Sequence, residues 1–215
     1  MCAITLKRTN DETCAEQRPR KMQRILMSSL PDRMKAAVAE PSPESILLKN
    51  NSVTIQSYTA FADFFQAPTE EEIAAYDHEA ITAIRTQNMD TLKQFHAQGR
   101  PLKCSNKFGE SLLHMACRKG MLEVTTYLVK DANVPFAVCD DYGRSPLHDA
   151  CWAHTTNFEL VDLILTECPD LLYIQDKRGN TPLSYLKQNK WAAWNKYLNS
   201  KPASFFQPRF AAPLL

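Results

Sequence analysis

The sequence predicts an all-α solenoid of helix-turn-helix repeats, because one short pattern recurs three times in the C-terminal two-thirds of the chain. Each copy has a glycine, a hydroxyl residue two positions later and a leucine two positions after that. The glycines are 34 residues apart from Gly109 to Gly143 and 36 apart from Gly143 to Gly179. Such periods are typical of solenoids in which each unit buries its apolar face against the next. We expect about four repeats with β-turn tips.

Each copy of the pattern predicts a tight turn followed by the start of a helix. Glycine at the turn tolerates a positive φ that a side chain would resist. The hydroxyls of Ser111, Ser145 and Thr181 can cap a helix by accepting an orphan backbone N–H. Pro146 and Pro182 follow at the first helical position, where the missing N–H of proline costs nothing. Three helix starts are therefore predicted.

A second apolar helix follows the first helix within the repeats. In 122–129, Val124 and Leu128 fall on one face by the spacing of a helix. The equivalent stretch of the next repeat is 159–165, and it comes two residues later relative to its helix start. We expect this insertion to form a bulge near 154–157, at the turn between the two helices.

Turn, helix and helix with this start resemble the ankyrin-repeat family. Residues 111–116 read Ser-Leu-Leu-His-Met-Ala and 145–150 read Ser-Pro-Leu-His-Asp-Ala, close to the family's Thr-Pro-Leu-His-x-Ala. The resemblance covers roughly residues 71–200. It departs at both ends, since no such start occurs upstream and Ser184 replaces the histidine downstream. Terminal repeats that cap a stack need atypical outer faces.

The predicted organisation has a solenoid between two tails. Residues 1–50 are polar with little periodicity, so we expect a disordered N-terminal tail. An aromatic linker or N-terminal cap segment is expected at 51–70, the ankyrin-repeat domain at 71–200 and a C-terminal tail at 201–215. Within the domain we expect a capping repeat at 75–105, repeats at 106–139 and 140–175, and a C-terminal capping repeat at 176–200.

Two N-terminal features each have two interpretations. Four aromatic residues lie within Tyr58–Phe65. We favour their covering the open N-terminal face of the stack, and the alternative is a linear motif that docks in another protein. A basic cluster precedes them and is either a solvated part of the tail, which is the commoner case, or a nuclear address. Its members are Arg18, Arg20, Lys21 and Arg24.

Composition argues against several functional classes. The net charge is +1, from 25 basic and 24 acidic residues, which provides no global field toward nucleic acid or an anionic membrane. No apolar run approaches the ~20 residues that cross a bilayer. The seven cysteines are odd in number and lack paired spacing, which favours reduced thiols. We expect an intracellular protein that is cytoplasmic, with the nucleus as the alternative.

Neither a catalytic nor a metal site is predicted. His114 with Cys117 and His148 with Cys151 have the spacing of helical metal ligands. Equivalent residues of adjacent repeats are about 8–10 Å apart, however, too far to converge on one zinc ion. The ankyrin resemblance instead implies structural hydrogen bonds for these histidines. No nucleophile motif or phosphate-binding glycine loop is present. We expect no enzyme activity, cofactor or small-molecule substrate.

The ankyrin resemblance implies binding through the turn tips and the concave face of the first helices. Trp152 is the sharpest candidate there, although it could equally be half-buried under the insertion at 154–157. Acidic and basic residues mix at the tips, which argues against a nucleic-acid groove and suits a protein partner. The candidates at the tips are Lys107, Phe108, Asp141, Tyr142, Lys177 and Arg178, and those on the first helices are Arg118 and Trp152.

The sequence therefore predicts a non-enzymatic adaptor or regulator that binds another protein, whose identity it does not reveal. The alternative is a nuclear regulator. In that case the basic tail contacts nucleic acid or an import receptor while the repeats bind a transcription factor.

Overall fold

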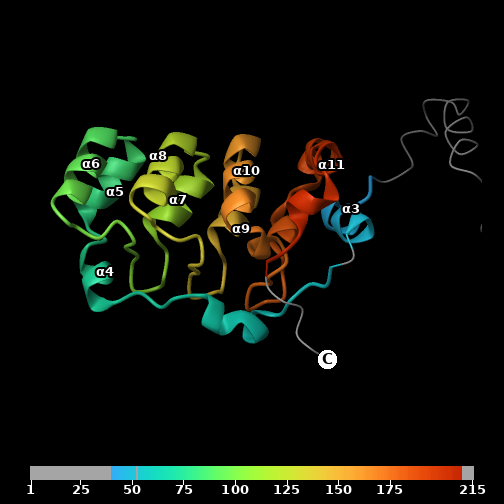
Figure 1. Cartoon of the computed structure of the whole chain (residues 1–215), viewed down its shortest axis with the longest axis horizontal. Coiled ribbons are helices and arrows are strands. Elements are labelled where there is room, and N and C mark those ends of the chain that lie inside the picture. The colour runs from blue at the N-terminus through green and yellow to red at the C-terminus, as the bar shows by residue number, and fades with distance from the viewer. Residues whose placement is uncertain (1–39, 52, 210–215) are drawn as a thin grey trace, which may run out of the picture. The chain divides into compact units, whose positions relative to one another are not determined.

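The computed structural model describes residues 40–51 and 53–209, and residues 41–209 form a row of helix pairs connected by long turns (Figure 1). The predicted all-α repeat solenoid is confirmed: the described residues contain helices and two isolated β-bridges but no strand. The predicted disorder of residues 1–39 lies outside the described residues. The α-helices are α3 Pro43–Asn50, α4 Glu70–Ala74, α5 His78–Arg85, α6 Met89–Ala97, α7 Leu112–Arg118, α8 Leu122–Thr126, α9 Pro146–Trp152, α10 Phe158–Glu167 and α11 Trp191–Ser200.

Shorter helical turns complete these elements. A π-helical turn extends α8 without a break, at Tyr127–Asp131. The 3-10 helices are Tyr58–Phe64, Pro169–Leu172, Pro182–Tyr185, Gln188–Lys190 and Ala203–Phe206. No described helix is long and apolar enough to cross a membrane.

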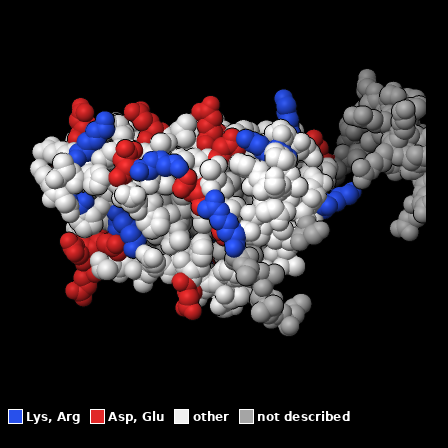
Figure 2. Space-filling view, in the orientation of Figure 1, with Lys and Arg blue, Asp and Glu red and all other residues white. Residues whose placement is uncertain are grey.

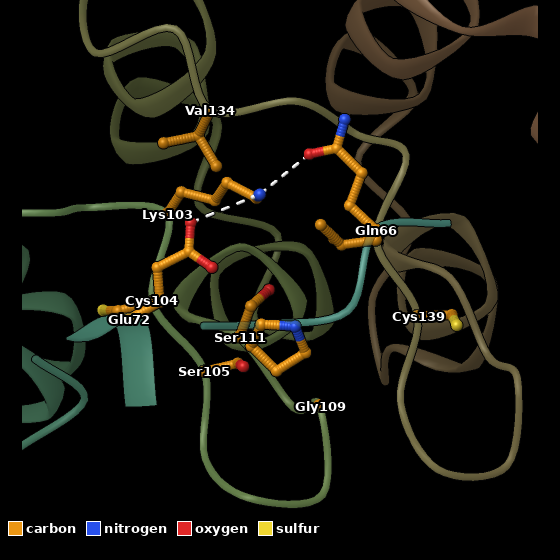
Figure 3. Close-up of a pocket in the computed structure, with 11 residues that line it drawn as sticks. Gln66, Glu72, Lys103, Cys104, Ser105, Gly109, Ser111, Val134 and Cys139 are labelled. Carbon is orange, nitrogen blue, oxygen red and sulfur yellow. Dashed lines mark hydrogen bonds and ion pairs between the residues drawn. The ribbon is translucent and has the colours of Figure 1, made fainter. Parts of the chain in front are cut away.

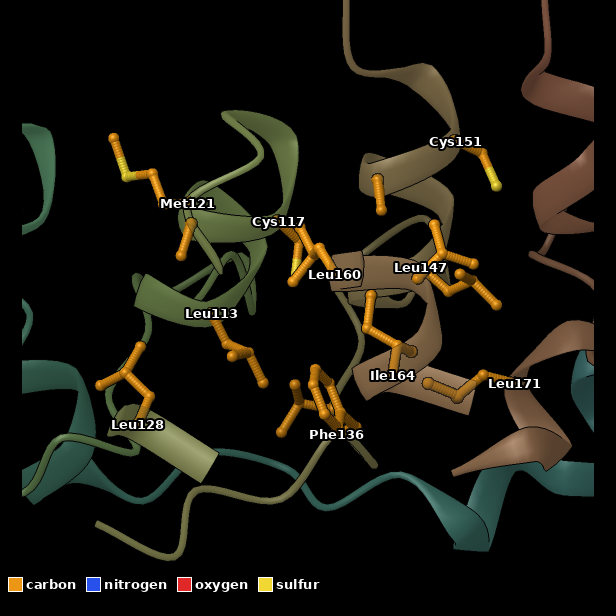
Figure 4. Packing of buried hydrophobic residues seen from close by; sticks show 14 of the residues in the cluster. Leu113, Cys117, Met121, Leu128, Phe136, Leu147, Cys151, Leu160, Ile164 and Leu171 are labelled. Carbon is orange, nitrogen blue, oxygen red and sulfur yellow. The ribbon is translucent and has the colours of Figure 1, made fainter. Parts of the chain in front are cut away.

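The core is a continuous layer of apolar side chains between neighbouring helix pairs (Figure 4). Leu113 from α7, Leu128 from the π-helical turn after α8, and Leu160 and Ile164 of α10 belong to one buried cluster. Phe136, in the segment that leads from the second helix to the next turn, is buried beside them. One repeat cannot bury this surface alone, so each depends on its neighbours.

The glycine turns form as predicted. Gly109, Gly143 and Gly179 have φ values of +77°, +78° and +80°. The second repeat also has its predicted longer turn, since α9 ends at Trp152 and α10 begins at Phe158. In the preceding repeat only three residues separate α7 from α8.

The motif histidines connect adjacent repeats. His148 accepts a bond at Nδ1 from the Ser145 N–H at 3.1 Å, and its Nε2 donates to the Asn180 carbonyl at 3.2 Å. Because an amide N–H only donates and a carbonyl only accepts, His148 is neutral with its proton on Nε2. Burial lowers the pKa of His148 from 6.5 to about 4. His114 makes the equivalent bonds to Ser111 at 3.2 Å and Arg144 at 2.9 Å.

The last repeat begins differently from the prediction. Thr181 was expected to cap an α-helix, but Pro182–Tyr185 is a 3-10 helix without a side-chain cap. The Thr181 hydroxyl instead donates to the Glu44 carboxylate and lies 3.0 Å from the Ser184 hydroxyl. The residue that replaces the motif histidine is Ser184, so the histidine bonds of the earlier repeats do not form here.

The predicted boundary of the disordered N-terminal tail, residue 50, is wrong because the last eight residues of that range form a helix. Residues 43–50, placed in the disordered tail by the sequence, form α3, which packs against α11 at the C-terminal end of the stack. Ser42 caps α3, and Leu47 is 1% exposed. The isolated polar stretch lacked periodicity, but one buried leucine and contacts to a distant helix are enough to order it.

The aromatic segment also lies elsewhere than expected. It does not cover the N-terminal face of the stack, where α5 and α6 lie. Residues 53–68, here called the strap, run past the turns from the last repeat back toward the first, below the helices in Figure 1. The Gln56 N–H donates to the Tyr173 carbonyl at 2.8 Å, and the Gln175 N–H donates to Gln56 at 2.9 Å. Further along, the Gln66 N–H donates to Ala137 at 3.4 Å.

The end of the strap is anchored near the first repeats. Lys103 binds the amide oxygen of Gln66 at 2.8 Å and the carboxylate of Glu72 at 3.2 Å (Figure 3). Arg100 donates to the Ala75 carbonyl at 2.9 Å and pairs with Asp77. The region from α3 to α4 thus contacts both ends of the stack.

Candidate protein-binding surface

The turn tips of successive repeats are connected by backbone hydrogen bonds. The Asp141 N–H donates to the Phe108 carbonyl at 2.7 Å, and the Lys177 N–H donates to the Tyr142 carbonyl at 2.9 Å. These four residues are candidates predicted from the sequence. The bonds hold them in a fixed register, so a partner would meet a pre-ordered edge rather than separate loops.

Aromatic side chains are exposed on this edge and beside it. Phe108 is 54% exposed, Tyr142 44% and Trp152 49%, and these are the exposed large hydrophobic side chains of the described residues. Phe108 and Tyr142 occupy equivalent tip positions in neighbouring repeats. Trp152 is the last residue of α9, and about half of its surface is exposed, so the predicted contact with a partner and the alternative of half-burial beside the insertion both stay open. Exposed Trp and Tyr are the residue types that most often carry binding energy.

Cations lie over two of these rings. The Lys107 ammonium is 5.0 Å from the Phe108 ring centre. The Tyr142 ring has the guanidinium of Arg178 at 4.4 Å and that of Arg144 at 5.2 Å. Such contacts are worth about 0.5–1 kcal/mol at exposed sites, enough to restrict the rotamers of long side chains.

The buried acids of the tips build the turns. Asp140 accepts the backbone N–H of Tyr142 at 3.0 Å and that of Arg144 at 2.8 Å, and its second oxygen accepts Nε of Arg144 at 2.7 Å. Asp176 accepts the N–H of Arg178 at 2.8 Å in the same way, and its other oxygen accepts the Tyr185 hydroxyl. These carboxylates stabilise the tips and are not available to a partner.

Lys177 connects the tips with the strap. Its ammonium donates to the Asp141 carbonyl at 2.9 Å and lies 5.1 Å from the centre of the Tyr58 ring. The Tyr58 hydroxyl is 3.9 Å from Sγ of Cys139, and burial raises the pKa of Tyr58 to about 12, so this phenol stays neutral. Lys177 is nonetheless exposed and makes no ion pair with a described residue.

Arg118 differs from the other candidates because its charge is used within the stack. Its guanidinium binds Glu110 of its own repeat and Asp149 of the next one, the latter at 3.0 Å. The side chain of Asp149 is only 5% exposed, and this burial raises its pKa. Arg118 therefore stabilises the junction between repeats, and contact with a partner would compete with these pairs.

The strap forms one wall of a small cavity against the turns. Figure 3 shows a small cavity there, about 20 Å³, between the strap and the segments at 103–105 and 134–139. Its walls are largely apolar, and the Lys103 pairs to Gln66 and Glu72 cross it. The aromatic density of the sequence identified the strap but not its position, because no local signal says which distant turns an extended segment will contact.

Charge on the visible face is mixed. Figure 2 shows Lys and Arg interspersed with Asp and Glu along the helices, without a continuous stripe of one sign. The described residues also contain no group of three or more His, Cys, Asp or Glu side chains that could hold a metal ion.

Comparison with known proteins agrees with the repeat pattern. A family model described as "Ankyrin repeats (3 copies)" matches residues 80–176. Among curated proteins, "SMC5-SMC6 complex localization factor protein 1" of Homo sapiens is 34% identical over 79 residues, which is 37% of this chain and 7% of the relative. The Mus musculus protein of that name is 29% identical over 109 residues, 43% of this chain and 10% of the relative. The chain thus spans a tenth or less of these relatives.

Proposed function

Because residues 80–176 are ankyrin repeats, we propose that this chain is a non-enzymatic adaptor or regulator that holds another protein on its turn tips and first helices. Ankyrin repeats are a protein-interaction architecture whose stacked units create an extended binding surface. The chemistry of any pathway it serves would then reside in the partner.

One observation carries the proposal. The exposed large hydrophobic residues of the described chain, namely Phe108, Tyr142 and Trp152, all lie on the turn tips or on a first helix. The strap contacts the same turns, where Tyr58 packs on Gly143 and lies beside Lys177, and it leaves these three rings exposed. A monomer gains nothing in stability from exposing these rings, whereas a partner would bury them.

The test is quantitative affinity capture from cell extract with the full chain. The bait variant combines Tyr142→Ala and Trp152→Ala, and a matched control combines Lys93→Ala and Lys196→Ala, which are exposed on α6 and α11. We expect at least one protein to be retained by the wild type and the control and lost from the variant. Thermal melts must first show that all three baits fold alike.

Retention of the same proteins by all three baits would contradict the proposed surface. Loss from the control as well would mean that the outer helices contribute, which the proposal does not allow.

A second candidate follows from the names of the relatives, which describe localization factors of the SMC5-SMC6 complex. In this version the partner belongs to such a complex, and the chain acts in the nucleus rather than in the cytoplasm. Subunits of the SMC5-SMC6 complex among the retained proteins would support it. Neutralising Arg18, Arg20, Lys21 and Arg24 should then move the protein out of the nucleus, and an unchanged distribution would argue against a nuclear address.

A further inference from the structure

We propose that the tip formed by Tyr142, Lys177 and Arg178, here called the Arg178 site, binds carboxylate side chains of an acidic segment in the partner protein. This inference rests on the proposed function and specifies the chemistry of the partner. The acidic segment would place carboxylates against Arg178 and Lys177 and an apolar side chain against the exposed edge of the neighbouring rings.

Arg178 is held in place without being neutralised. Its guanidinium lies 4.4 Å from the Tyr142 ring centre, and no hydrogen bond or ion pair connects that guanidinium to any described residue. Stacking on a ring occupies the face of the guanidinium and leaves its N–H groups at the edge free. Those groups form the fork that matches a carboxylate in a bidentate pair.

The nearby acids make no ion pair with this guanidinium in the described chain. The carboxylate of Asp176 accepts the backbone N–H groups of Arg178 and Asn180 and the Tyr185 hydroxyl, the last at 2.6 Å, and does not contact the Arg178 guanidinium. Asp140 is likewise paired with Arg144. Of the two arginines beside the Tyr142 ring, Arg144 is therefore paired with a carboxylate and Arg178 is not.

Lys177 adds a second uncompensated cation to the same tip. Its ammonium bonds a backbone carbonyl of the preceding tip, which fixes the side chain but leaves the positive charge. The exposed acid on this edge is Asp141, one tip back. A segment lying along the edge would thus meet two cations at the third tip and one anion at the second, which favours an acidic residue opposite Arg178.

The order of these charges also sets the orientation of the ligand. Lys107 lies over Phe108 at the first tip, exposed and without an ion pair in the described chain. A ligand with carboxylates at one end, opposite Arg178 and Lys177, and an apolar residue toward Phe108 complements the edge in one direction. In the reversed orientation, the carboxylates of the ligand no longer lie opposite Arg178 and Lys177.

The experiment uses the full chain and three fluorescein-labelled twelve-residue peptides, measured by anisotropy at low and at high salt. The first peptide carries three glutamates at one end and a leucine at the other, the second has glutamine in place of each glutamate, and the third is the first with its order reversed. We expect the acidic peptide to bind about tenfold tighter than the glutamine peptide, with the difference shrinking at high salt.

Variants assign the binding to the site. Arg178→Ala should weaken the acidic peptide about tenfold, and Arg178→Lys, which keeps the charge but loses the fork, should weaken it less. Lys119→Ala removes an exposed lysine just after α7, away from the tips, and should change nothing. Arg178→Glu should reverse the preference between the acidic peptide and a matched lysine peptide.

Equal binding of the acidic and glutamine peptides, no binding of either, or equal losses in Arg178→Ala and Lys119→Ala would each overturn the inference. These failures are distinct from failure of the proposed function. If Tyr142→Ala with Trp152→Ala still abolishes capture of a partner, the chain binds protein at this surface but not through acidic residues.

Discussion

The two sides of the turn tips treat similar aromatic residues in opposite ways. On the strap side, Phe65 is 9% exposed and Tyr58 packs so closely on Gly143 that a Cβ there would lie 2.7 Å from its ring. On the open side, Phe108 and Tyr142 are about half exposed, at 54% and 44%. The strap buries the aromatic residues on one side of the tips, whereas the rings on the open side remain exposed to solvent or to a partner.

The exposed rings leave an accessible surface for a partner, whereas the rings under the strap are already covered. A solenoid normally depends on contacts between neighbouring repeats. Here the strap adds contacts that span several repeats, and α3 closes the C-terminal end against α11. Residues on the strap side should therefore control stability, and residues on the open side should control binding.

The largest effect is expected at the helix that closes the stack. Leu47→Ala removes a side chain that is 1% exposed between α3 and α11, and it should lower the free energy of unfolding by about 2–5 kcal/mol. Urea denaturation measures this. Lys49→Ala, at an exposed position of the same helix, is the matched control and should change it by less than about 0.5 kcal/mol. Equal effects would mean that α3 does not close the stack.

The contact between strap and turn can be isolated with two glycines. Gly143→Ala and Gly179→Ala both place a side chain at a φ near +80°, but only the first meets the Tyr58 ring, whereas nothing lies closer than 4.0 Å at Gly179. Both variants should lose about 1–2 kcal/mol of stability, because alanine resists a positive φ. Gly143→Ala should lose about 1–3 kcal/mol more, because its methyl group also clashes with the Tyr58 ring. Thermal melts of the pair give the difference.

Combining Gly143→Ala with Tyr58→Ala provides the control, because the shorter side chain gives the new methyl group room. The additional destabilisation caused by Gly143→Ala, compared with Gly179→Ala, should then be smaller. Part of it should remain, because the Lys177 backbone nitrogen lies 3.1 Å from the added Cβ. An unchanged additional destabilisation would place the strap elsewhere.

The repeat junction should show a dependence on pH. The pKa of His148 falls from 6.5 to about 4 on folding, so between these values the unfolded chain binds the additional proton. The contribution of neutral His148 to the free energy of unfolding is fully present above pH 6.5. It is lost as the pH falls toward 4, and the loss is on the order of 2–3 kcal/mol. Urea denaturation at several pH values measures the slope. The His148→Gln variant should be less stable than the wild type at neutral pH, but its free energy of unfolding should depend less on pH between 4 and 6.5. Equal pH dependence in the two proteins would assign the effect to other groups.

The smallest effects on stability are expected on the open side. Phe108→Ala and Trp152→Ala should each lower the free energy of unfolding by about 1–2 kcal/mol at most, because only about half of each ring is buried. Phe65→Ala, on the strap side, should lower it by about 3–5 kcal/mol. Thermal melts compare the three, and similar losses would erase the distinction between the two sides.

The repeats were predictable because their signals are local. A glycine and a hydroxyl residue at fixed spacing mark each turn, and a proline follows the hydroxyl residue in two of the three copies. Recognising this period needs no knowledge of distant contacts. The same logic located the exposed tips. It did not reveal that Arg118 is paired across a repeat junction, since Glu110 and Asp149 meet it only after the helices stack.

The strap and α3 were not predictable in this way. Their order depends on partners more than 80 residues away in the chain, as between Tyr58 and Cys139, and a short polar helix has no stability of its own. The same holds for Thr181, whose hydroxyl was expected to cap a helix but instead meets Glu44 of α3.

The most direct test of the central claim is site-specific photo-crosslinking in cells. A photoreactive phenylalanine analogue is placed at Phe108 or Trp152 on the open side, or at Ala62, which is exposed on the strap. We expect adducts with a common partner from Phe108 and Trp152 and none from Ala62. Adducts with that partner from Ala62 alone would show that the strap is the binding element and would contradict the central claim.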